Sequence, residues 1–373
     1  MATTLTLLLL ALLGLAGFVA WSWGLFTSPR LEREVEVDGI TRRYLAWMPR
    51  GRRKDIALPV VFAFHPGFST PEGFETHSAL HTARAASKFI VVYPQGHKKS
   101  WNAGTCCGPA MRDKIDEGHF VKAILNDLER ITPIDRRRVY ATGFSNGARL
   151  CYYLAGTMSE VFAAIAPVGG VVLTDWRPRR PMPIFHVHGL DDTFAPFGGG
   201  ESAWKKVPPS GSVEAGIEFW RTVASAPHES HENILRNAAA ECVEYSGGTD
   251  GTRIYLCKIA GLGHHWPNTH ATQGYLRFAK YMELGPLGPK IDVNEPILDF
   301  LSAFELPERY TPRAHQREGW PAGARNPLLS SERGGERRDL RSNGGIAPMH
   351  NLSRKLGRRW AQKPQNHSRG LLR

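Results

Sequence analysis

Residues 138–156 read RVYATGFSNGARLCYYLAG, and this stretch decides the expected fold. Its opening residues are mostly apolar, as in a buried strand, and the apolar residues of its second half recur at helical spacing. Between the two halves, Gly143-Phe144-Ser145-Asn146-Gly147 matches Gly-x-Ser-x-Gly, the sharp turn that exposes a nucleophilic serine between a strand and a helix. This five-residue pattern alone is weak, so the flanking strand and helix carry the prediction that Ser145 is a nucleophile.

Similar strand and helix patterns alternate along residues 30–305. Runs that are apolar throughout suit strands covered on both faces, as in a parallel sheet. They are Pro59–Phe64, Phe89–Tyr93, Arg138–Thr142, Phe162–Ala166 and Pro183–Val187. Two earlier segments, Glu34–Val37 and Tyr44–Met48, alternate like antiparallel strands, and helical patterns cover Phe120–Leu128 and Ala148–Ala155. The sequence therefore predicts a catalytic domain over residues 30–307 with the α/β-hydrolase fold, a mostly parallel doubly wound sheet with antiparallel N-terminal strands.

The net charge of the 373-residue chain is +12, a value that on its own would indicate a nucleic-acid-binding protein. The charge is concentrated in residues 309–373, which hold 15 Lys and Arg residues and 4 acidic residues. The other 308 residues carry a net charge of only +1, so no nucleic-acid partner is expected for the folded domain. Residues 308–373 also have few apolar positions and no sustained period, which predicts a basic disordered tail.

An apolar segment without charged residues runs from Leu5 to Phe26 near the start of the chain. Its 22 residues would be long enough, at about 1.5 Å per residue in a helix, to cross a bilayer. Residues 1–26 are interpreted as a signal peptide or as an uncleaved membrane anchor. For an anchor, Arg30 and Arg33 directly after the segment would place the following domain on the cytoplasmic side. Export is nevertheless our expectation, with a secreted or extracytoplasmic domain, and membrane attachment through residues 5–26 stays open.

The chain has five cysteines, and none has the C-x-x-C spacing of a zinc site, so no metal is expected. Cys242 and Cys257 flank a predicted hairpin, Val243–Ser246 and Thr252–Leu256. If the turn is centred between Thr249 and Asp250, the two cysteines lie opposite each other at the spacing that a disulfide needs. A disulfide and a pair of free buried thiols are both open until the compartment is known.

A serine nucleophile needs a histidine base, and in this fold an acid and then the histidine follow the serine along the chain. Asp191 and Asp192 come directly after the buried strand Ile184–His188 and a glycine, where an orienting acid belongs. His264 and His265 lie on a glycine-rich loop after the strand Ile254–Lys258, from which a histidine can reach Ser145. The residues alone do not choose within either pair.

An oxyanion hole requires two backbone N–H groups directed at the developing charge. The first is expected from Asn146, the residue after the nucleophile. The second is expected from the loop His65-Pro66-Gly67-Phe68. Because Pro66 has no N–H, the donor is Gly67 or Phe68, and Phe68 is our expectation.

Six motifs resemble the polyhydroxybutyrate depolymerase and feruloyl esterase family of α/β-hydrolases. They are SWNAG at 100–104, CCGP at 106–109, RVYATGFSNG at 138–147, FAAIAPV at 162–168, HGLDD at 188–192 and GHHWP at 263–267. The resemblance covers roughly residues 55–275. It implies an extracellular carboxylic-ester hydrolase without a cofactor, with Asp192 as the orienting acid and His264 as the base.

The resemblance has further implications and two limits. It places Trp101 and Trp266 beside the active site, where an indole could stack on an aryl group or sugar ring; burial of Trp101 in the core is the alternative. It also raises a disulfide from Cys106 or Cys107 to Cys151. The proline in His65-Pro66-Gly67 departs from the direct His-Gly of the family, and the segment beyond Pro307 has no recognised counterpart.

Taken together, these features predict a serine esterase that forms an acyl-enzyme. The expected substrates are small or polymeric esters: hydroxycinnamoyl or acetyl esters of polysaccharide, or polyhydroxyalkanoate. Two alternatives stay open, a membrane-tethered binding protein of the same fold without turnover and a serine peptidase of the fold. The sequence does not predict the oligomeric state.

Overall fold

The computed structural model describes residues 30–310, apart from residues 50, 52, 54, 106–107, 205–208 and 269–271, together with Gly14. The chain divides into two units, Met1–Pro312 and Arg313–Arg373, and every described residue belongs to the first. The predicted signal or anchor segment apart from Gly14, the predicted tail beyond residue 310, and both Cys106 and Cys107 therefore lie outside the described residues. Within those residues, no helix is both long and apolar enough to cross a membrane.

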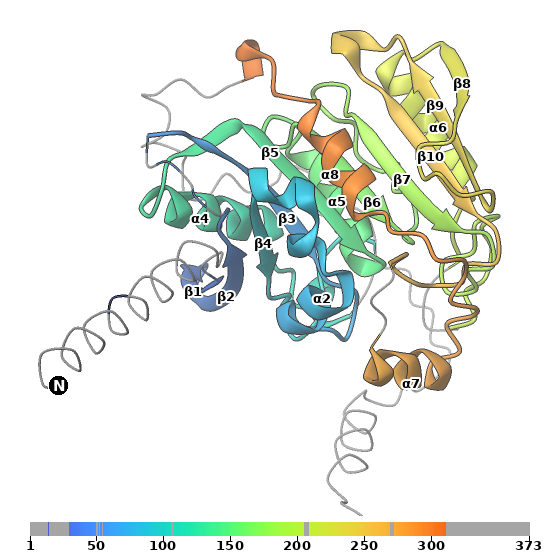
Figure 1. The fold of residues 1–373 in the computed structure, drawn as a ribbon, viewed down its shortest axis with the longest axis horizontal. Helices are drawn as coiled ribbons and strands as arrows, with labels where there is room; N and C mark the ends of the chain where they lie inside the picture. Colours follow the sequence, from blue (N-terminus) through green and yellow to red (C-terminus); the bar gives the residue numbers. More distant parts are fainter. Residues whose placement is uncertain are drawn as a thin grey trace, which may run out of the picture. The chain divides into compact units, whose positions relative to one another are not determined.

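One sheet organises the described part of the chain, with the strand order β1-β2-β4-β3-β5-β6-β7-β10-β9-β8 (Figure 1). Neighbouring strands from β4 to β10 run parallel, whereas β1 and β2 at one edge, and β9 and β8 at the other, pair antiparallel. The bounds are β1 (Arg30–Val37), β2 (Ile40–Trp47), β3 (Leu58–Phe64), β4 (Ile90–Pro94), β5 (Ile134–Phe144), β6 (Ala164–Val168), β7 (Ile184–Gly189), β8 (His228–Glu232), β9 (Ala240–Ser246) and β10 (Ile254–Ile259). This arrangement confirms the predicted α/β-hydrolase fold.

Helices cover both faces of the sheet, and a buried core lies on each face. Phe120, Leu150 and Trp220, from three helices, belong to one core, and Phe74 and Leu301 belong to the other. The helices are α2 (Pro71–Ser78), α3 (Pro109–Arg112), α4 (Glu117–Glu129), α5 (Asn146–Thr157), α6 (Val213–Ala224), α7 (Gln273–Tyr281) and α8 (Asn294–Ser302). Short 3₁₀ turns are η1 (Leu80–Thr82), η2 (Arg84–Lys88), η3 (Thr249–Gly251) and η4 (Glu308–Tyr310).

The strands and helices named from the sequence are present, with ends that differ by a few residues. Strand β8 was not expected, because its sequence HESHE is polar and mostly exposed at the sheet edge and so lacks an apolar pattern. Helix α6 was not expected either, although its buried Val213, Ile217, Trp220 and Ala224 recur at helical spacing. The limits of the catalytic domain, residues 30–307, stay a prediction.

A disulfide joins Cys242 on β9 to Cys257 on β10, and the register pairs these two residues directly. The 3₁₀ turn η3 lies between the two strands, at the position expected for the hairpin turn. Cys151 is a buried free thiol, so the predicted bond from Cys106 or Cys107 to Cys151 is not found. Its side chain, on α5, instead belongs to the buried core on that face of the sheet.

Candidate active site

Ser145 occupies the sharp turn between β5 and α5. Its φ of 56° lies in the left-handed region, which a residue with a side chain seldom adopts. Close approach of the chain requires Gly147, because a Cβ there would lie 2.1 Å from the carbonyl oxygen of Phe64 on β3. The Ser145 amide donates to the carbonyl oxygen of Val168, at 3.0 Å, which anchors the turn to β6.

His264 reaches the serine from the loop after β10. Its Nε2 atom lies 2.8 Å from Ser145 Oγ and its Nδ1 atom lies 2.7 Å from Asp192 Oδ2. The imidazole packs against two phenylalanine rings, with centroid distances of 4.8 Å to Phe144 and 5.5 Å to Phe194. The backbone amide of His264 donates to the carbonyl oxygen of Leu284 at 2.7 Å, which holds the loop in place.

Asp192 is buried directly after β7, and its second carboxylate oxygen accepts hydrogen bonds from the amides of Phe194, at 2.9 Å, and Ala195, at 2.8 Å. Burial favours the neutral acid, but the charge and hydrogen bond of His264 outweigh burial, so the pKa of Asp192 lies below its usual value. The neighbouring Asp191 is exposed. Of the two aspartates, the structure brings Asp192 to His264.

His265 points away from Ser145. Its Nδ1 atom lies 2.7 Å from the hydroxyl of Tyr275 on α7, and its Nε2 atom lies 3.1 Å from the carbonyl oxygen of Gly285. Burial lowers its pKa. These contacts connect α7 to the loop that carries His264, so His265 holds that loop in place and does not contact Ser145.

The two expected oxyanion residues lie on adjoining segments. Asn146 is the first residue of α5, so its N–H has no partner within the helix. Gly67 adjoins it, since a Cβ on Gly67 would lie 3.8 Å from the Cβ of Asn146. The amide of Phe68, in contrast, donates to the carbonyl oxygen of Lys99 at 2.8 Å. The expectation that Phe68 supplies the second donor is therefore corrected, because its N–H is already engaged.

The segment Ser100–Asn102 braces the oxyanion side of the site. The amide of Trp101 donates to Oδ1 of Asn146 at 2.8 Å, and its indole Nε1 donates to the carbonyl oxygen of His65 at 2.8 Å. Both bonds are buried, so they fix the nucleophile turn and the loop that begins at His65 to one segment. The amide of Gly96 donates to Nε2 of the His65 ring at 2.9 Å, and burial lowers the pKa of His65 to about 4.

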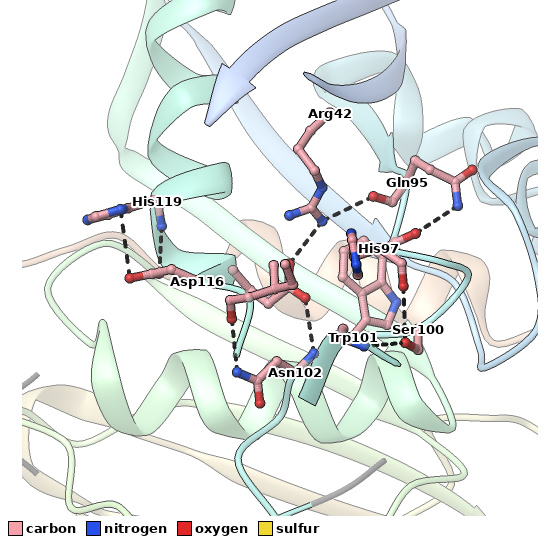
Figure 2. Close-up of polar contacts among 12 residues, drawn as sticks. Arg42, Gln95, His97, Ser100, Trp101, Asn102, Asp116 and His119 are labelled. Atoms are coloured by element: carbon pink, nitrogen blue, oxygen red, sulfur yellow. Dashed lines mark hydrogen bonds and ion pairs between the residues drawn. The ribbon is translucent and has the colours of Figure 1, made fainter. Parts of the chain in front are cut away.

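A buried ion pair between Arg42 and Glu117 holds the segment Ser100–Asn102 (Figure 2). Glu117, on α4, accepts from the amide of Asn102 at 3.0 Å and from the Arg42 guanidinium at 3.0 Å. Arg42 also donates to the carbonyl oxygen of Gln95 at 3.1 Å and lies over the ring of Phe120. Burial raises the pKa of Glu117, with the positive charge of Arg42 opposing it.

The two tryptophans expected to contact substrate are buried. Trp101 has no exposed surface and packs edge-on against Phe64, with centroids 5.2 Å apart. Trp266 is 2% exposed, and its Nε1 donates to Oδ1 of Asn294 at 3.1 Å. Neither indole has a free face on which a ring could stack, so the expectation is corrected: both support loops of the site.

Other aromatic side chains adjoin the site: Phe68, expected from the sequence only as a backbone donor, and Trp204 and Phe194, which the sequence analysis did not name. Phe68 is 55% exposed at a φ of 67°, and its ring meets that of Trp204 edge-to-face at 5.2 Å. The segment of Trp204 lies beside the acid loop, because the amide of Ala203 donates to the carbonyl oxygen of Thr193. Phe194 stacks on His264 from the same loop. In the sequence, Phe68 belongs to the oxyanion loop and Phe194 follows the acid by two residues, and this proximity was the signal that could have predicted their place in the site.

Comparison with known proteins shows which sequences this chain is similar to. The chain is 30% identical over 222 residues to a probable feruloyl esterase C of Aspergillus flavus, covering 57% of this chain and 78% of that protein. It is 33% identical over 230 residues to poly(3-hydroxyalkanoate) depolymerase C of Paucimonas lemoignei, covering 56% and 55%. The chain belongs to the feruloyl esterase and polyhydroxybutyrate depolymerase family of α/β-hydrolases.

Members of this family differ in length. The match to feruloyl esterase B of Piromyces equi, 26% identical over 235 residues, covers 60% of this chain but only 42% of that protein, so the chain spans less than half of this relative. No family model matches the chain. An acetyl xylan esterase structure from Aspergillus awamori aligns at a TM-score of 0.46 with 16% identity, covering 68% of this chain and 100% of that one.

Metal ligands were not expected from the sequence of this family member. Among the described residues, no group of three or more His, Cys, Asp and Glu side chains has an arrangement that could hold a metal ion.

Proposed function

We propose that this protein is a serine carboxylic-ester hydrolase in which Ser145 is the nucleophile, His264 the base and Asp192 the orienting acid. The observation that carries the proposal is the continuous hydrogen-bonded series from Asp192 through His264 to Ser145, with distances of 2.7 Å and 2.8 Å. A serine hydroxyl is a weak nucleophile unless such a base accepts its proton. Membership of a family whose named relatives include a feruloyl esterase and a poly(3-hydroxyalkanoate) depolymerase supports the same reaction.

The reaction follows from these positions. His264 Nε2 accepts the proton of Ser145 Oγ as the oxygen attacks the ester carbonyl, and Asp192 stabilises the resulting imidazolium. The amides of Asn146 and Gly67 stabilise the negative oxygen of the tetrahedral intermediate. His264 then protonates the departing alcohol, and the ester oxygen leaves as the acyl-enzyme forms. Water, deprotonated by His264, releases the acid and regenerates Ser145.

We further propose that the preferred acyl group carries an aromatic ring, as in hydroxycinnamoyl esters, ahead of acetyl or hydroxyalkanoate esters. Phe68 and Trp204 support this preference, because they offer ring surface on the oxyanion loop and on the segment beside the acid loop. An exposed phenylalanine in the left-handed region combines two unfavourable features, which is typical of a functional position. Offset or edge-on contact between aromatic rings adds about 0.5–1.5 kcal/mol beyond the burial of area.

An extracytoplasmic location belongs to the same proposal. The disulfide between Cys242 and Cys257 supports it, because such bonds persist in oxidising compartments and are rare in the cytosol. The proposed catalytic domain is residues 30–307, preceded by the segment 1–26 and followed by the basic segment 308–373.

The test compares kcat/KM for methyl ferulate, ethyl acetate and a feruloyl p-nitroanilide. We expect methyl ferulate to be the best of the three, and Phe68→Ala or Trp204→Ala to lower its kcat/KM by roughly threefold to tenfold with little change for ethyl acetate. Phe278→Ala is the matched control, because Phe278 is an exposed phenylalanine on α7. A faster reaction with the anilide would favour a peptidase, and an unchanged ferulate preference in Phe68→Ala would contradict the aromatic assignment.

A further inference from the structure

Three buried side chains beneath the site have no part in the reaction as described. His186 and His188 are both on β7, and because residues two apart on a strand share a face, their rings stack at 5.2 Å. Tyr152, on α5, lies against His186. Two histidines and a tyrosine without contact with solvent are costly to bury unless their polar atoms are all paired.

The polar atoms of these residues form one continuous series. The Tyr152 hydroxyl lies 2.8 Å from Nδ1 of His186, and Nε2 of His186 lies 3.0 Å from Nδ1 of His188. Nε2 of His188 lies 2.7 Å from the carbonyl oxygen of Ala195 and 3.6 Å from Oδ2 of Asp192. The series therefore ends on the loop that carries the orienting acid.

The last bond sets the direction of all the others. A carbonyl oxygen can only accept, so Nε2 of His188 must carry the hydrogen that it donates to Ala195. Burial lowers the pKa of both His186 and His188, so each ring is neutral and has one donor and one acceptor. Nδ1 of His188 then accepts from Nε2–H of His186, and Nδ1 of His186 accepts from the hydroxyl of Tyr152.

Ala195 transmits this arrangement to the acid. Its carbonyl oxygen accepts from His188, and its amide donates to Oδ1 of Asp192 at 2.8 Å. The backbone of Ala195 is thus held by His188 at its carbonyl group, and at its amide it in turn holds the carboxylate of Asp192. The hydrogen bonds of the series thus all run toward the loop that carries Asp192.

We propose that Tyr152, His186 and His188 are positioning residues that form a hydrogen-bonded relay of fixed direction, which holds the backbone of Ala195 and through it the carboxylate of Asp192 in the orientation that His264 requires. The effect on turnover rests on the proposed function. The tautomers of the two histidines do not, so they provide an independent test.

The first experiment records nitrogen NMR spectra of the full chain with isotope-labelled histidine. Signals of the two rings are assigned by comparison with His186→Gln and His188→Gln. We expect both rings to carry their hydrogen on Nε2 at about pH 8, where free histidines are neutral. A hydrogen on Nδ1 of either ring would overturn the relay whether or not the protein hydrolyses esters.

The second experiment measures kcat and KM separately on methyl ferulate. In metal sites, loss of a residue that orients a ligand through a hydrogen bond lowers affinity or activity by roughly 10-fold to 100-fold. By analogy, we expect His188→Leu to lower kcat by roughly that factor, with KM within about threefold. His188→Gln should recover kcat to within about fivefold, because a glutamine amide can donate from the place of Nε2. Tyr152→Phe removes only one hydroxyl and should lower kcat by about threefold; it gives the same comparison if His188→Leu does not fold.

Val187→Ala is the matched control for a loosened strand, because Val187 lies between the two histidines on β7 and is buried in the core of the other face. We expect its kcat to stay within about threefold of the native value. A fall in Val187→Ala equal to that in His188→Leu, or no recovery in His188→Gln, would overturn the positioning role. If the native protein hydrolyses no ester, the proposed function fails, and the tautomers still decide on the relay.

Discussion

The backbone amide of Trp101 donates a buried hydrogen bond to the side chain of Asn146, the residue that follows the nucleophile, with Oδ1 at 2.8 Å. This bond joins the segment after β4 to the first turn of α5. Because the amide of Asn146 is the first proposed oxyanion donor, the direction of that amide depends on the contact. The side chain of Asn146 thus fixes the position of its own backbone amide, which is the proposed oxyanion donor.

Asn146→Ala keeps the backbone N–H but removes this acceptor. We expect a loss of roughly tenfold or more in kcat on methyl ferulate and of about 1–3 kcal/mol in the free energy of unfolding, since a buried N–H is left unpaired. Ser159→Ala is the control, because Oγ of Ser159, just beyond the other end of α5, accepts a hydrogen bond from the backbone amide of Arg179 at 2.9 Å. Urea unfolding should show a comparable loss in both variants, with kcat reduced only in Asn146→Ala; equal kcat values would contradict the account.

The adjacent aspartates give a paired test of the acid. Asp192→Asn keeps the shape but favours the wrong imidazole tautomer, so kcat/KM on methyl ferulate should fall by up to about four orders of magnitude. Asp191 is exposed, and Asp191→Asn should cost less than about tenfold. The opposite order would move the orienting role to Asp191, and near-native activity in both variants would mean that another group orients His264.

A buried histidine outside the site should make stability depend on pH. Among the described residues, neither ring nitrogen of His77 has a hydrogen-bond partner, and the ring lies 3.8 Å from that of Tyr275. Burial, with a smaller contribution from His265, lowers the pKa of His77 to about 3. Between that value and the usual 6.5 the unfolded chain binds more protons, so the stability that neutral His77 permits is lost as pH falls through this window.

His77→Phe removes both the unpaired nitrogens and the titration. Relative to the native protein, we expect it to be more stable by about 1–3 kcal/mol at about pH 8. The difference should grow by roughly 2 kcal/mol at about pH 5, because only the native chain then gains protons at residue 77 on unfolding. Urea unfolding at the two pH values measures the difference, and a gap that does not widen at the lower pH would show that the pKa of His77 is not lowered.

The disulfide closes a loop with a sequence separation of 15. Loops of this length predict a stabilisation of about 3 kcal/mol, so the double variant Cys242→Ala, Cys257→Ala should lose roughly that amount in urea unfolding. Its activity in the folded state should change little, since both residues lie on strands away from Ser145. Reducing agent should destabilise the native protein and leave the double variant unaffected; a native protein indifferent to reduction would indicate that the bond is absent in solution.

Much of the fold could be read from the sequence because its signals are local. The dense apolar runs of β3 to β7 and the turn around Ser145 each lie within a dozen residues, so periodicity and glycine spacing are sufficient to predict them. The polar edge strand β8 has no such pattern, because its one neighbour, β9, supplies its backbone hydrogen bonds and no core covers it.

The lining of the site could not be read in the same way. Phe68 and Trp204 meet across 136 positions of the chain, and no local pattern reports such a contact. The role expected of Trp101 failed for a related reason: a motif places the residue near the serine, but burial between Phe64 and the bonds to His65 and Asn146 decides which way its ring faces. The amide of Phe68 likewise donates to the carbonyl oxygen of Lys99, a residue on another loop, and no local pattern reports that hydrogen bond.

Activation of Ser145 by His264 can be measured through covalent labelling with a fluorophosphonate. We expect the native protein to be labelled on Ser145, as located by peptide mass spectrometry. Ser145→Ala should take no label, and His264→Ala should be labelled slower by roughly three orders of magnitude or more, since the members of a triad act as a unit. His265→Ala, which changes the neighbouring imidazole, should be labelled at close to the native rate. Absence of label on the folded native protein, or equal labelling of native protein and His264→Ala, would contradict this activation.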